Sequence, residues 1–520
     1  MNRFSLWRPA SGSRAALAAL ALAFTPLAAL ADVSLPRLIS DGVVFQRDRA
    51  IRLWGEAEPG EKIAVHLAGR TAHAIAANDR RWSLELDALS AGGPYVLAVQ
   101  GNNRIEVKDV YLGELWVASG QSNMEWPLRE TTGAAEEIAA SANEGIRVFK
   151  VKRALKDERQ TDVSGEWRAA SPAASGSFTA VGYYFAKFIQ TKLGVPVGIV
   201  DSTWGGTPAA AWTPHEDLAR DAELEAFITR YEEACRVFPE KNLPYLEKLR
   251  AWEAAAGPHP TREQTIAKPQ PPIGPGHPSK PSGLFNGMVA PLLPLRVRGV
   301  IWYQGESDAP RAATYRKLFP TLIASWRREW QQPDLPFLYV QISGYLAKRD
   351  TAAGSPWAEL REAQLQTLHV PHTGMAVTID IGEPNDIHPR NKREVGRRLS
   401  LLAREQIYGE TLETSGPVLV QAKRAGATWR LRFSHTAGGL KANDGGAIRG
   451  FTIAGEDRRF VPAEARVDGD ELVVSGALHD PVAVRYAWTE SPVATLANAV
   501  GLPASPFRTD DWPLVTLAQP

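Results

Sequence analysis

The chain contains 520 residues, of which 44% are hydrophobic and 22% are charged, and its formal net charge is +1. This length exceeds that of one ordinary hydrophobic core and favours about three domains, while the composition is typical of a soluble globular protein. The near balance of acidic and basic residues excludes the strongly basic surface by which proteins bind nucleic acid or anionic membranes.

The first 31 residues have the features of a secretory signal peptide. Arginines precede an apolar run over 15–24, and Ala29-Leu30-Ala31 has the A-x-A pattern of a cleavage site. A membrane anchor is the alternative, but the apolar core is short for a bilayer span and Pro26 interrupts its end. Removal of the leader takes three arginines and no acidic residue, which changes the formal charge to −2. We therefore expect an exported protein without membrane insertion.

Cys235 is the only cysteine of the chain, so no internal disulfide can form. An exported protein without disulfides suits the bacterial periplasm or secretion into the medium. One cysteine cannot build a cysteine zinc site, and the sequence contains no H-E-x-x-H motif. We therefore expect no metal and no cofactor, and nothing in the sequence indicates an obligatory protein partner.

Residues 32–110 are predicted to form an N-terminal β domain. Three short stretches alternate apolar and polar residues with period two, and turn residues separate them: 63–67, 82–86 and 95–99. Strands at this spacing are typical of a small β-sandwich.

At Tyr111 the pattern changes to strands that alternate with helices, which indicates a parallel sheet. The apolar run 115–118 predicts a buried strand that ends at Gly120. Ser122 follows this glycine turn, at the edge where open α/β sheets bind their ligands, so it is a candidate nucleophile. Met124 stands where the G-x-S-x-G motif has its second glycine, which disfavours an ordinary α/β-hydrolase.

The remaining chain divides into further predicted units. These are the first part of a catalytic domain at 111–210, an insertion at 211–284, the second part at 285–410, and a C-terminal β domain at 411–520. Expected strands of the sheet are 146–151, 197–200, 300–303, 337–342 and 375–379, and expected helices are 178–193 and one from Pro389 to about Ile407. Within the C-terminal domain Asp468-Gly469 predicts a hairpin.

The insertion differs from its surroundings in composition. Residues 216–256 are helical in composition and spacing, and 268–281 form a Pro-rich linker. The insertion is predicted either to wall the site or to be a solvated excursion.

Three stretches together carry a family resemblance: Gly120-Gln121-Ser122-Asn123-Met124, Trp302-Tyr303-Gln304-Gly305-Glu306-Ser307 and Asn385-Asp386-Ile387-His388-Pro389-Arg390-Asn391-Lys392. In this order they resemble the sialate O-acetylesterase family, a branch of the SGNH (GDSL-like) hydrolases. The resemblance runs from about Asp41 to the C-terminal region. It implies an α/β fold, with an SGNH-hydrolase-like parallel sheet flanked by helices and with β-sandwich-like domains at both ends.

A serine hydroxyl needs a base to become a nucleophile, and histidine is the usual base near neutral pH. Of the ten histidines, only His388 stands beside an acid in a strand-to-helix turn of the sheet domain. Most SGNH hydrolases have the orienting acid three residues before this histidine, but that position is Asn385 here. We expect Asp386 to orient the imidazole, because a carboxylate also stabilises the imidazolium that forms. The alternative is that Asp386 caps the next helix, with the orienting group at Glu383, Asp380 or a main-chain carbonyl.

The resemblance also implies which groups bind the negative oxygen of the tetrahedral intermediate. The expected donors are the main-chain N–H of Ser122, the main-chain N–H of Gly206 and the side chain of Gln304. The residues expected around the substrate are Gln121, Asn123, Trp204, Asn286 and Glu306. Among these, Glu306 is expected chiefly to support its loop by accepting main-chain hydrogen bonds.

The favoured function is a serine esterase that removes O-acetyl groups from a sugar or glycan through an acyl-enzyme and water, first of all from sialic acid. Acetylated hemicellulose, such as xylan or xyloglucan, is the alternative substrate, and no residue separates the two. Another SGNH activity, such as a lipase or thioesterase, is disfavoured because the tryptophans near the motifs suit sugar stacking. A non-catalytic carbohydrate-binding protein is disfavoured by the complete set of serine, glycine, glutamine and histidine.

Overall fold

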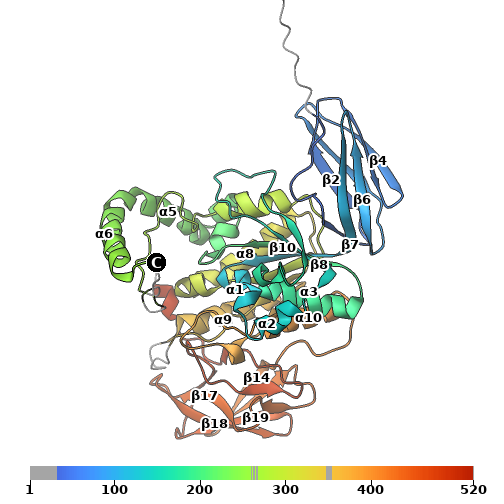
Figure 1. Cartoon of the computed structure of the whole chain (residues 1–520). Coiled ribbons are helices and arrows are strands. Elements are labelled where there is room, and N and C mark those ends of the chain that lie inside the picture. The colour runs from blue at the N-terminus through green and yellow to red at the C-terminus, as the bar shows by residue number, and fades with distance from the viewer. Residues whose placement is uncertain (1–31, 259–260, 262–263, 265–266, 347–353, 519–520) are drawn as a thin grey trace, which may run out of the picture.

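The computed structural model describes residues 32–258, 261, 264, 267–346 and 354–518. The expected signal peptide, residues 1–31, lies outside this range. An N-terminal β domain and a C-terminal β domain lie on two different sides of a central α/β domain (Figure 1). In the described part of the chain, no helix is both long and apolar enough to cross a membrane.

Runs of consecutive apolar residues build the strands of the central sheet, because both faces of this sheet are covered. Leu115 to Ala118, for example, are each at most 1% exposed. Across the sheet the strands follow the order β13 (Thr373–Ala376), β12 (Phe337–Val340), β11 (Gly299–Tyr303), β7 (Arg104–Gly120), β10 (Val197–Thr203), β8 (Asn143–Lys150) and β9 (Trp167–Ala170). Neighbours on this path are parallel, except that β9 runs antiparallel to β8. The predicted α/β class with a parallel sheet is confirmed.

The strand β7 belongs to two domains. Its first part pairs with β6 (Gly92–Gln100) and β1 (Val44–Gln46) of the N-terminal β domain, and from Glu114 onward it pairs with β10 and β11. Burial along β7 alternates at first and becomes continuous in the second part, because the strand passes from a sheet covered on one face to a sheet covered on both. The expected domain boundary at 110 therefore falls inside one unbroken strand.

The described helices are α1 (Ser122–Glu125), α2 (Ala134–Ala139), α3 (Ala180–Leu193), α4 (His215–Ala219), α5 (Ala222–Arg236), α6 (Phe238–Ala256), α8 (Ala312–Glu329), α9 (Pro356–Gln366) and α10 (Lys392–Gln406). On one face of the central sheet, Trp116 of β7 lies edge-on to Phe185 of α3, and α10 packs beside α3. On the other face, Trp302 of β11 lies edge-on to Trp326 of α8. The helices thus enclose the strands whose ends form the site.

Two positions in these elements differ from the sequence-based expectations. The helix expected from Pro389 begins at Lys392, because Asn391 caps it by accepting a hydrogen bond from the main-chain N–H of Glu394. The last parallel strand is Thr373–Ala376 rather than 375–379, and a short helical turn occupies the following residues.

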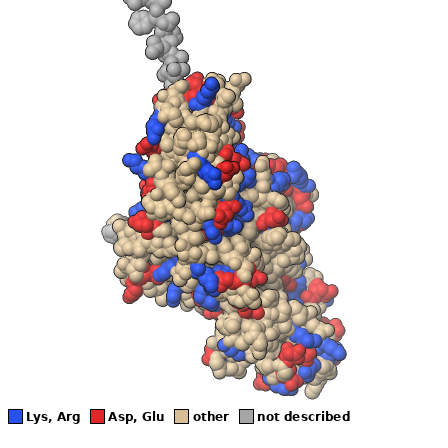
Figure 2. Space-filling model, turned by 90° about the vertical axis from the view of Figure 1, so that its right-hand side faces the viewer, with Lys and Arg blue, Asp and Glu red and all other residues tan. Residues whose placement is uncertain are grey.

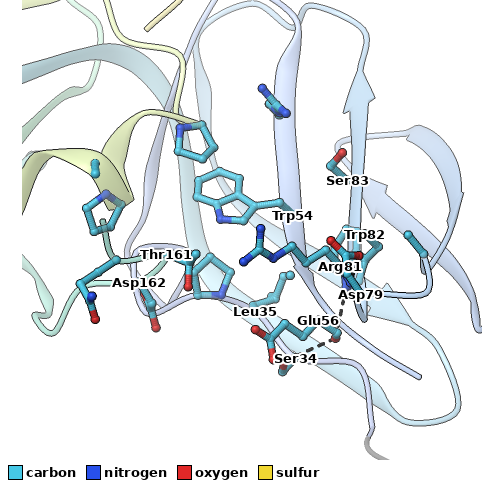
Figure 3. Close-up of a pocket in the computed structure, with 18 residues that line it drawn as sticks. Ser34, Leu35, Trp54, Glu56, Asp79, Arg81, Trp82, Ser83, Thr161 and Asp162 are labelled. Carbon is cyan, nitrogen blue, oxygen red and sulfur yellow. Dashed lines mark hydrogen bonds between the residues drawn. The ribbon is translucent and has the colours of Figure 1, made fainter. Parts of the chain in front are cut away.

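The N-terminal β domain is built from antiparallel strands with alternating burial: β2 (Ile51–Glu56), β3 (Lys62–Leu67), β4 (Arg70–Ile75), β5 (Arg81–Leu86) and β6. β2 and β5 pair with each other as a two-stranded ribbon. The ribbon buries Ile51, Leu53 and Trp82, while Trp54 points to its opposite, outward face. This face is turned toward the central domain (Figure 3).

The C-terminal β domain is antiparallel, in the order β14 (Val418–Ala425), β15 (Thr428–Ser434), β19 (Glu471–Gly476), β18 (Phe460–Asp468), β17 (Ile448–Ala454), β20 (Ala483–Tyr486) and β22 (Phe507–Arg508). The expected hairpin at Asp468-Gly469 joins β18 to β19. Arg361 of α9 attaches this domain to the central one. Its fully buried guanidinium donates to the main-chain oxygens of Ile342, Ser343, Thr489 and Glu490.

The helical part of the insertion is largely solvated. The side chains of α6 are all partly or fully exposed, and Leu224 and Phe227 are the buried residues of α5. These two helices extend away from the central domain (Figure 1). Of the two alternatives predicted for the insertion, α5 and α6 correspond to the solvated excursion.

Candidate active site

The turn that presents Ser122 depends on Gly120, the last residue of β7. Gly120 has a φ of +131°, and a Cβ there would lie 2.2 Å from the main-chain oxygen of Tyr303 in β11. The main-chain N–H of Gln121 donates to the same oxygen at 3.0 Å. This close approach of two strands requires glycine and fixes where α1 begins. Ser122 is therefore the first residue of α1, at the carboxyl edge of the sheet.

The loop after β10 lies against the nucleophile turn. A Cβ on Gly205 would come within 3.2 Å of the Ser122 Cβ, and the Gly205 N–H donates to Glu125 Oε2 at 2.9 Å. The other carboxylate oxygen of Glu125 pairs with Arg153, whose guanidinium lies 5.4 Å from the ring centre of Trp204. Glu125 thus fixes both the glycine loop and a half-exposed cation beside the serine.

Two main-chain donors near the serine have no hydrogen-bond acceptor among the described residues: the N–H of Ser122 and the N–H of Gly206. Gly206 is exposed with a φ of +74°, and a Cβ on it would meet no atom within 4 Å. Both donors are therefore available to a ligand in this region.

His388 stacks on the indole of Trp126, with the ring centres 4.4 Å apart and the planes inclined by 20°. The pKa of His388 is lowered to about 4, chiefly by burial and also by the charge of the nearby Lys392, while Asp386 opposes this shift. The imidazole is therefore neutral at pH 7. Its Nε2 atom is buried and has no hydrogen-bond partner in the described part of the chain. A neutral imidazole with an unoccupied nitrogen is the form that accepts a proton.

A hydrogen bond between the neighbours of Ser122 and His388 links the two loops. The amide of Asn123 donates to the main-chain oxygen of Ile387 at 3.0 Å. Since Asn123 follows the serine and Ile387 precedes the histidine, this bond joins the nucleophile turn to the histidine loop. Within the described residues, Ser122 and His388 themselves share no hydrogen bond.

Asn123 also belongs to a buried polar cluster. Its amide donates to Glu306, and its oxygen accepts from the ammonium group of Lys392, the first residue of α10. Burial lowers the pKa of Lys392 to about 7 and raises the pKa of Glu306. All three side chains are at most 7% exposed, so they form the support beneath the site rather than its surface.

Asp386 lies beside the imidazole. Its Oδ1 accepts the main-chain N–H of His388 at 3.0 Å and lies 3.7 Å from the ring Nδ1. The cap of α10 is Asn391, so Asp386 does not cap this helix. The other two carboxylates considered have different partners, because Asp380 pairs with Arg398 and Glu383 accepts the main-chain N–H of Arg390.

Gln304 does not face the site in this structure. Its side chain is fully buried, and its amide donates to the main-chain oxygen of Thr207 at 3.2 Å and to Asp308 Oδ2 at 2.7 Å. Its oxygen accepts from the hydroxyl of Tyr315 at 3.0 Å. Neither N–H remains for an oxyanion, in contrast to the expectation. The reason is Asp308, which lies four residues later and binds the amide inside the protein.

The other residues expected around the substrate differ in exposure. Gln121 is 2% exposed, and its oxygen accepts the main-chain N–H of Ser307 at 3.2 Å, which fixes the loop after β11. Asn286 is 9% exposed and donates to the main-chain oxygen of Asp157 at 2.8 Å. Of the five expected residues, Trp204 is the one that is half-exposed, whereas Gln121, Asn123, Asn286 and Glu306 are buried.

Sequence reasoning missed the roles of Trp126, Glu125 and Lys392. Glu125 and Trp126 directly follow the first stretch, and Lys392 is the last residue of the third. Their positions were therefore noticeable, but nothing in the sequence indicated the contacts that the structure shows. Their partners lie far away in the sequence. Among the described residues, no group of three or more His, Cys, Asp or Glu side chains is arranged to hold a metal ion.

Comparison with known proteins shows which proteins the chain resembles. Residues 284–403 match the family model of the carbohydrate esterases described as sialic acid-specific acetylesterases. The chain is 28% identical to mouse sialate O-acetylesterase, covering 88% of this chain and 90% of the mouse protein. It is 27% identical to the human sialate O-acetylesterase, with 90% and 91% covered.

A solved structure extends the comparison to the whole fold. The crystal structure of a carbohydrate acetylesterase from Xanthomonas citri is 42% identical in sequence and superposes with a TM-score of 0.80. The match covers 92% of this chain and all of that one. The chain therefore belongs to the sialic acid-specific acetylesterase family of carbohydrate esterases, which are carboxylic ester hydrolases.

Proposed function

We propose that the protein is a serine esterase that removes O-acetyl groups from a carbohydrate by way of an acyl-enzyme. The observation that carries this proposal is the neutral His388, whose Nε2 has no hydrogen-bond partner in the described part of the chain. A hydrogen bond joins the loop of this histidine to Asn123, the residue after Ser122. The serine stands at the carboxyl edge of the parallel sheet, where the chain turns sharply at Gly120.

In the first half of the reaction, the Ser122 oxygen attacks the acetyl carbonyl and its proton passes to His388 Nε2. The C–O bond to the sugar then breaks, and the imidazolium returns the proton to the departing sugar oxygen. In the second half, His388 takes a proton from water as the water oxygen attacks the acetyl-serine. The imidazolium then returns this proton to the Ser122 oxygen as the bond between that oxygen and the acetyl carbon breaks, and the acetyl group leaves as acetic acid. Asp386 favours this sequence because its charge stabilises the imidazolium in both halves.

The negative oxygen of each tetrahedral intermediate is assigned to the main-chain N–H groups of Ser122 and Gly206. Each such donor typically contributes about 3–4 kcal/mol to the lowering of the barrier. Gln304 acts indirectly in this proposal, because its amide holds the main chain at Thr207, directly after Gly206.

Sialic acid esters are the first proposed substrate, because the half-exposed guanidinium of Arg153 lies beside the serine turn and suits the carboxylate of a sialic acid. Acetylated hemicellulose is the second, because the relative with 42% identity is named as a carbohydrate acetylesterase without mention of sialic acid. We also propose that the signal peptide directs the enzyme to the periplasm or the medium.

The test compares Ser122→Ala with Ser307→Ala, which removes a serine from the second motif. Acetate release from O-acetylated sialic acid, acetylated xylan and acetylated xyloglucan is measured side by side. We expect kcat to fall by roughly 10⁴-fold or more in Ser122→Ala and to change little in Ser307→Ala. Substantial turnover by Ser122→Ala would contradict the proposal, and the preferred ester among the three decides the substrate.

A further inference from the structure

A cavity of about 620 Å³ lies between the N-terminal β domain and the central domain. It is formed by the outward face of the β2–β5 ribbon on one side and by the loops at 160–162 and 290–294 on the other. Figure 3 shows Trp54 and Arg81 of the ribbon pointing toward the side on which Thr161 and Asp162 lie. None of the residues assigned to the ester chemistry lines it, so it is separate from the site described above.

The outward face of the ribbon carries an unusual set of side chains. Pairing places Trp54 opposite Ser83, Arg52 opposite Glu85, and Glu56 opposite Arg81. Since side chains alternate along a strand, all of these residues share one face. A half-buried tryptophan flanked by polar and charged residues on an outward face lies at the edge of the core rather than within it, which favours a binding role.

The two tryptophans of the ribbon, Trp82 and Trp54, differ in the direction in which their side chains point. Trp82 points inward, is 3% exposed, and donates its indole N–H to the main-chain oxygen of Glu56 at 3.3 Å. Trp54 points to the cavity, is half-buried, and has an indole N–H with no acceptor among the described residues. Trp82 therefore stabilises its own domain, while Trp54 lines the cavity with an apolar ring and has a buried indole N–H without an acceptor among the described residues.

The charged side chains of the cavity differ in their partners, since Asp79 and Asp162 already accept hydrogen bonds from main-chain N–H groups. In the described part of the chain, the guanidinium groups of Arg52 and Arg81 form no ion pair. The carboxylates of Glu56, Asp79 and Asp162 line the same cavity. Donors and acceptors are thus mixed. On the face of the molecule that Figure 2 shows, basic and acidic side chains are likewise interspersed. Such a mixture suits hydroxyl groups, which both donate and accept, better than it suits a polyanion.

We propose that this cavity is a second carbohydrate-binding site, which holds a neutral sugar ring of a polysaccharide on the indole of Trp54. Arg52 and Arg81 donate hydrogen bonds to the sugar hydroxyls, and the carboxylates accept from them. The site anchors the glycan and takes no part in ester hydrolysis. The proposed esterase function enters only in the choice of a glycan as ligand.

The placement of the cavity explains how such an anchor would assist the enzyme. The segment from Arg153 to Asp162 connects the two regions, because Arg153 contacts Glu125 beside the nucleophile and Asp162 lines the cavity. A long glycan held at the cavity therefore stays near the ester-cleaving site, which raises its local concentration there. A small ester has no such benefit.

The test uses unacetylated probes, so that it does not depend on catalysis. Isothermal titration calorimetry measures the Kd of cellohexaose, xylohexaose and 3′-sialyllactose for the full mature chain, for Trp54→Ala and for Arg81→Gln. Trp252→Ala, which removes a half-buried tryptophan of the insertion, is the matched control. Arg81 is exposed, so its variant keeps the test valid if Trp54→Ala fails to fold.

We expect the Kd for one of the two neutral hexasaccharides to rise by about tenfold or more in Trp54→Ala and by about threefold in Arg81→Gln. Trp252→Ala should bind as the natural chain does, and hydrolysis of 4-nitrophenyl acetate should be unchanged in all three. Equal Kd values in the natural chain and Trp54→Ala, or no binding of either hexasaccharide, would overturn the proposal. Tighter binding of 3′-sialyllactose would overturn the assignment to a neutral sugar. Absence of 4-nitrophenyl acetate hydrolysis in the natural chain, with hexasaccharide binding retained, would contradict only the proposed function.

Discussion

At the scale of single residues, the environment of His388 decides in which pH range the enzyme has a usable base. An imidazole in water has a pKa near 6.5 and is largely protonated in mild acid. Burial against Trp126 removes water from His388, which disfavours its charged form, and the positive charge of Lys392 acts in the same direction. The imidazole therefore stays neutral until the pH falls to about 4.

The prediction at this scale concerns the pH dependence of the activity. We expect kcat/KM of the natural chain to stay high on acidification and to decline only near pH 4, since His388 must be neutral to accept the serine proton. Asp386 opposes the lowering of the pKa, so Asp386→Asn should move the acid limb to still lower pH. The same variant should reduce kcat, because the imidazolium loses its counter-charge.

Asn385→Ala is the control for this prediction, because it changes the neighbouring residue without changing a charge. Its acid limb should match that of the natural chain. Intrinsic fluorescence must show that each protein is folded over the pH range used. An acid limb near pH 6.5 in the natural chain would contradict the assignment of His388 as a buried base.

The sequence could indicate candidate reacting residues but not the orientation of every side chain. Ser122 and His388 could be proposed because their chemistry is specific and they stand at predicted strand ends. The amide of Gln304 has a suitable chemistry too, yet Asp308 and Thr207 hold it inside the protein. Asn123 looked like a substrate ligand, although its partners Glu306 and Lys392 bury it. The orientation of these side chains depends on contacts with residues far away in the sequence. The local pattern of a single sequence does not show such contacts.

At the scale of elements, the end of β7 controls the position of the nucleophile. The strand comes so close to β11 at Gly120 that no side chain fits, and α1 starts two residues later. The turn is therefore specified by packing between two strands rather than by the local sequence of the turn.

The element-scale prediction is that Gly120→Ala is strongly destabilising and inactivates the enzyme. A Cβ would lie 2.2 Å from the Tyr303 oxygen, and the φ of +131° adds strain. We expect a loss of roughly 3 kcal/mol or more in the free energy of unfolding. Gly133→Ala is the matched control, since Gly133 has a φ of +71° but open space around it, and it should lose only about 1 kcal/mol. Urea titration measures both, and equal losses would contradict the steric argument.

Strands with continuous apolar runs were the easiest elements to predict. The runs at 197–200 and 300–303 lie within β10 and β11, and the helix expected at 178–193 corresponds to α3 from Ala180. The ends of elements were predicted less accurately. The start of α10 is an example, because several polar residues near it could serve as the cap and Asn391 is the one that does. The cavity between domains could not be predicted, since it arises from how the β2–β5 ribbon faces the central domain.

At the scale of the whole molecule, buried groups join the parts of the chain. Glu114 lies where β7 enters the central sheet, is fully buried, and pairs with Arg47 from the N-terminal side and with Arg298 before β11. Arg361 has the corresponding position at the C-terminal β domain, where its guanidinium binds main-chain oxygens of both domains. We therefore expect the three parts to unfold together.

The prediction at this scale is a single thermal transition in calorimetry that Arg361→Met divides into two. Removal of the guanidinium leaves four buried carbonyl oxygens without this donor, so the loss should be roughly 4 kcal/mol or more. Arg430→Met is the control, because its ion pairs with Asp468 and Glu471 are exposed to solvent and should contribute little to the free energy of unfolding. Two transitions in the natural chain would contradict the prediction.

The continuity of β7 also limits how this architecture can be rearranged by gene recombination. A domain connected through a linker can be exchanged by crossover at the linker, and both products fold. Here a crossover between residues 104 and 120 divides a strand whose two parts have different partners. The recombinant would keep β6 and β1 without their original partner, or a nucleophile turn without its original strand. The N-terminal β domain and the catalytic sheet are therefore expected to be inherited together, as one evolutionary unit.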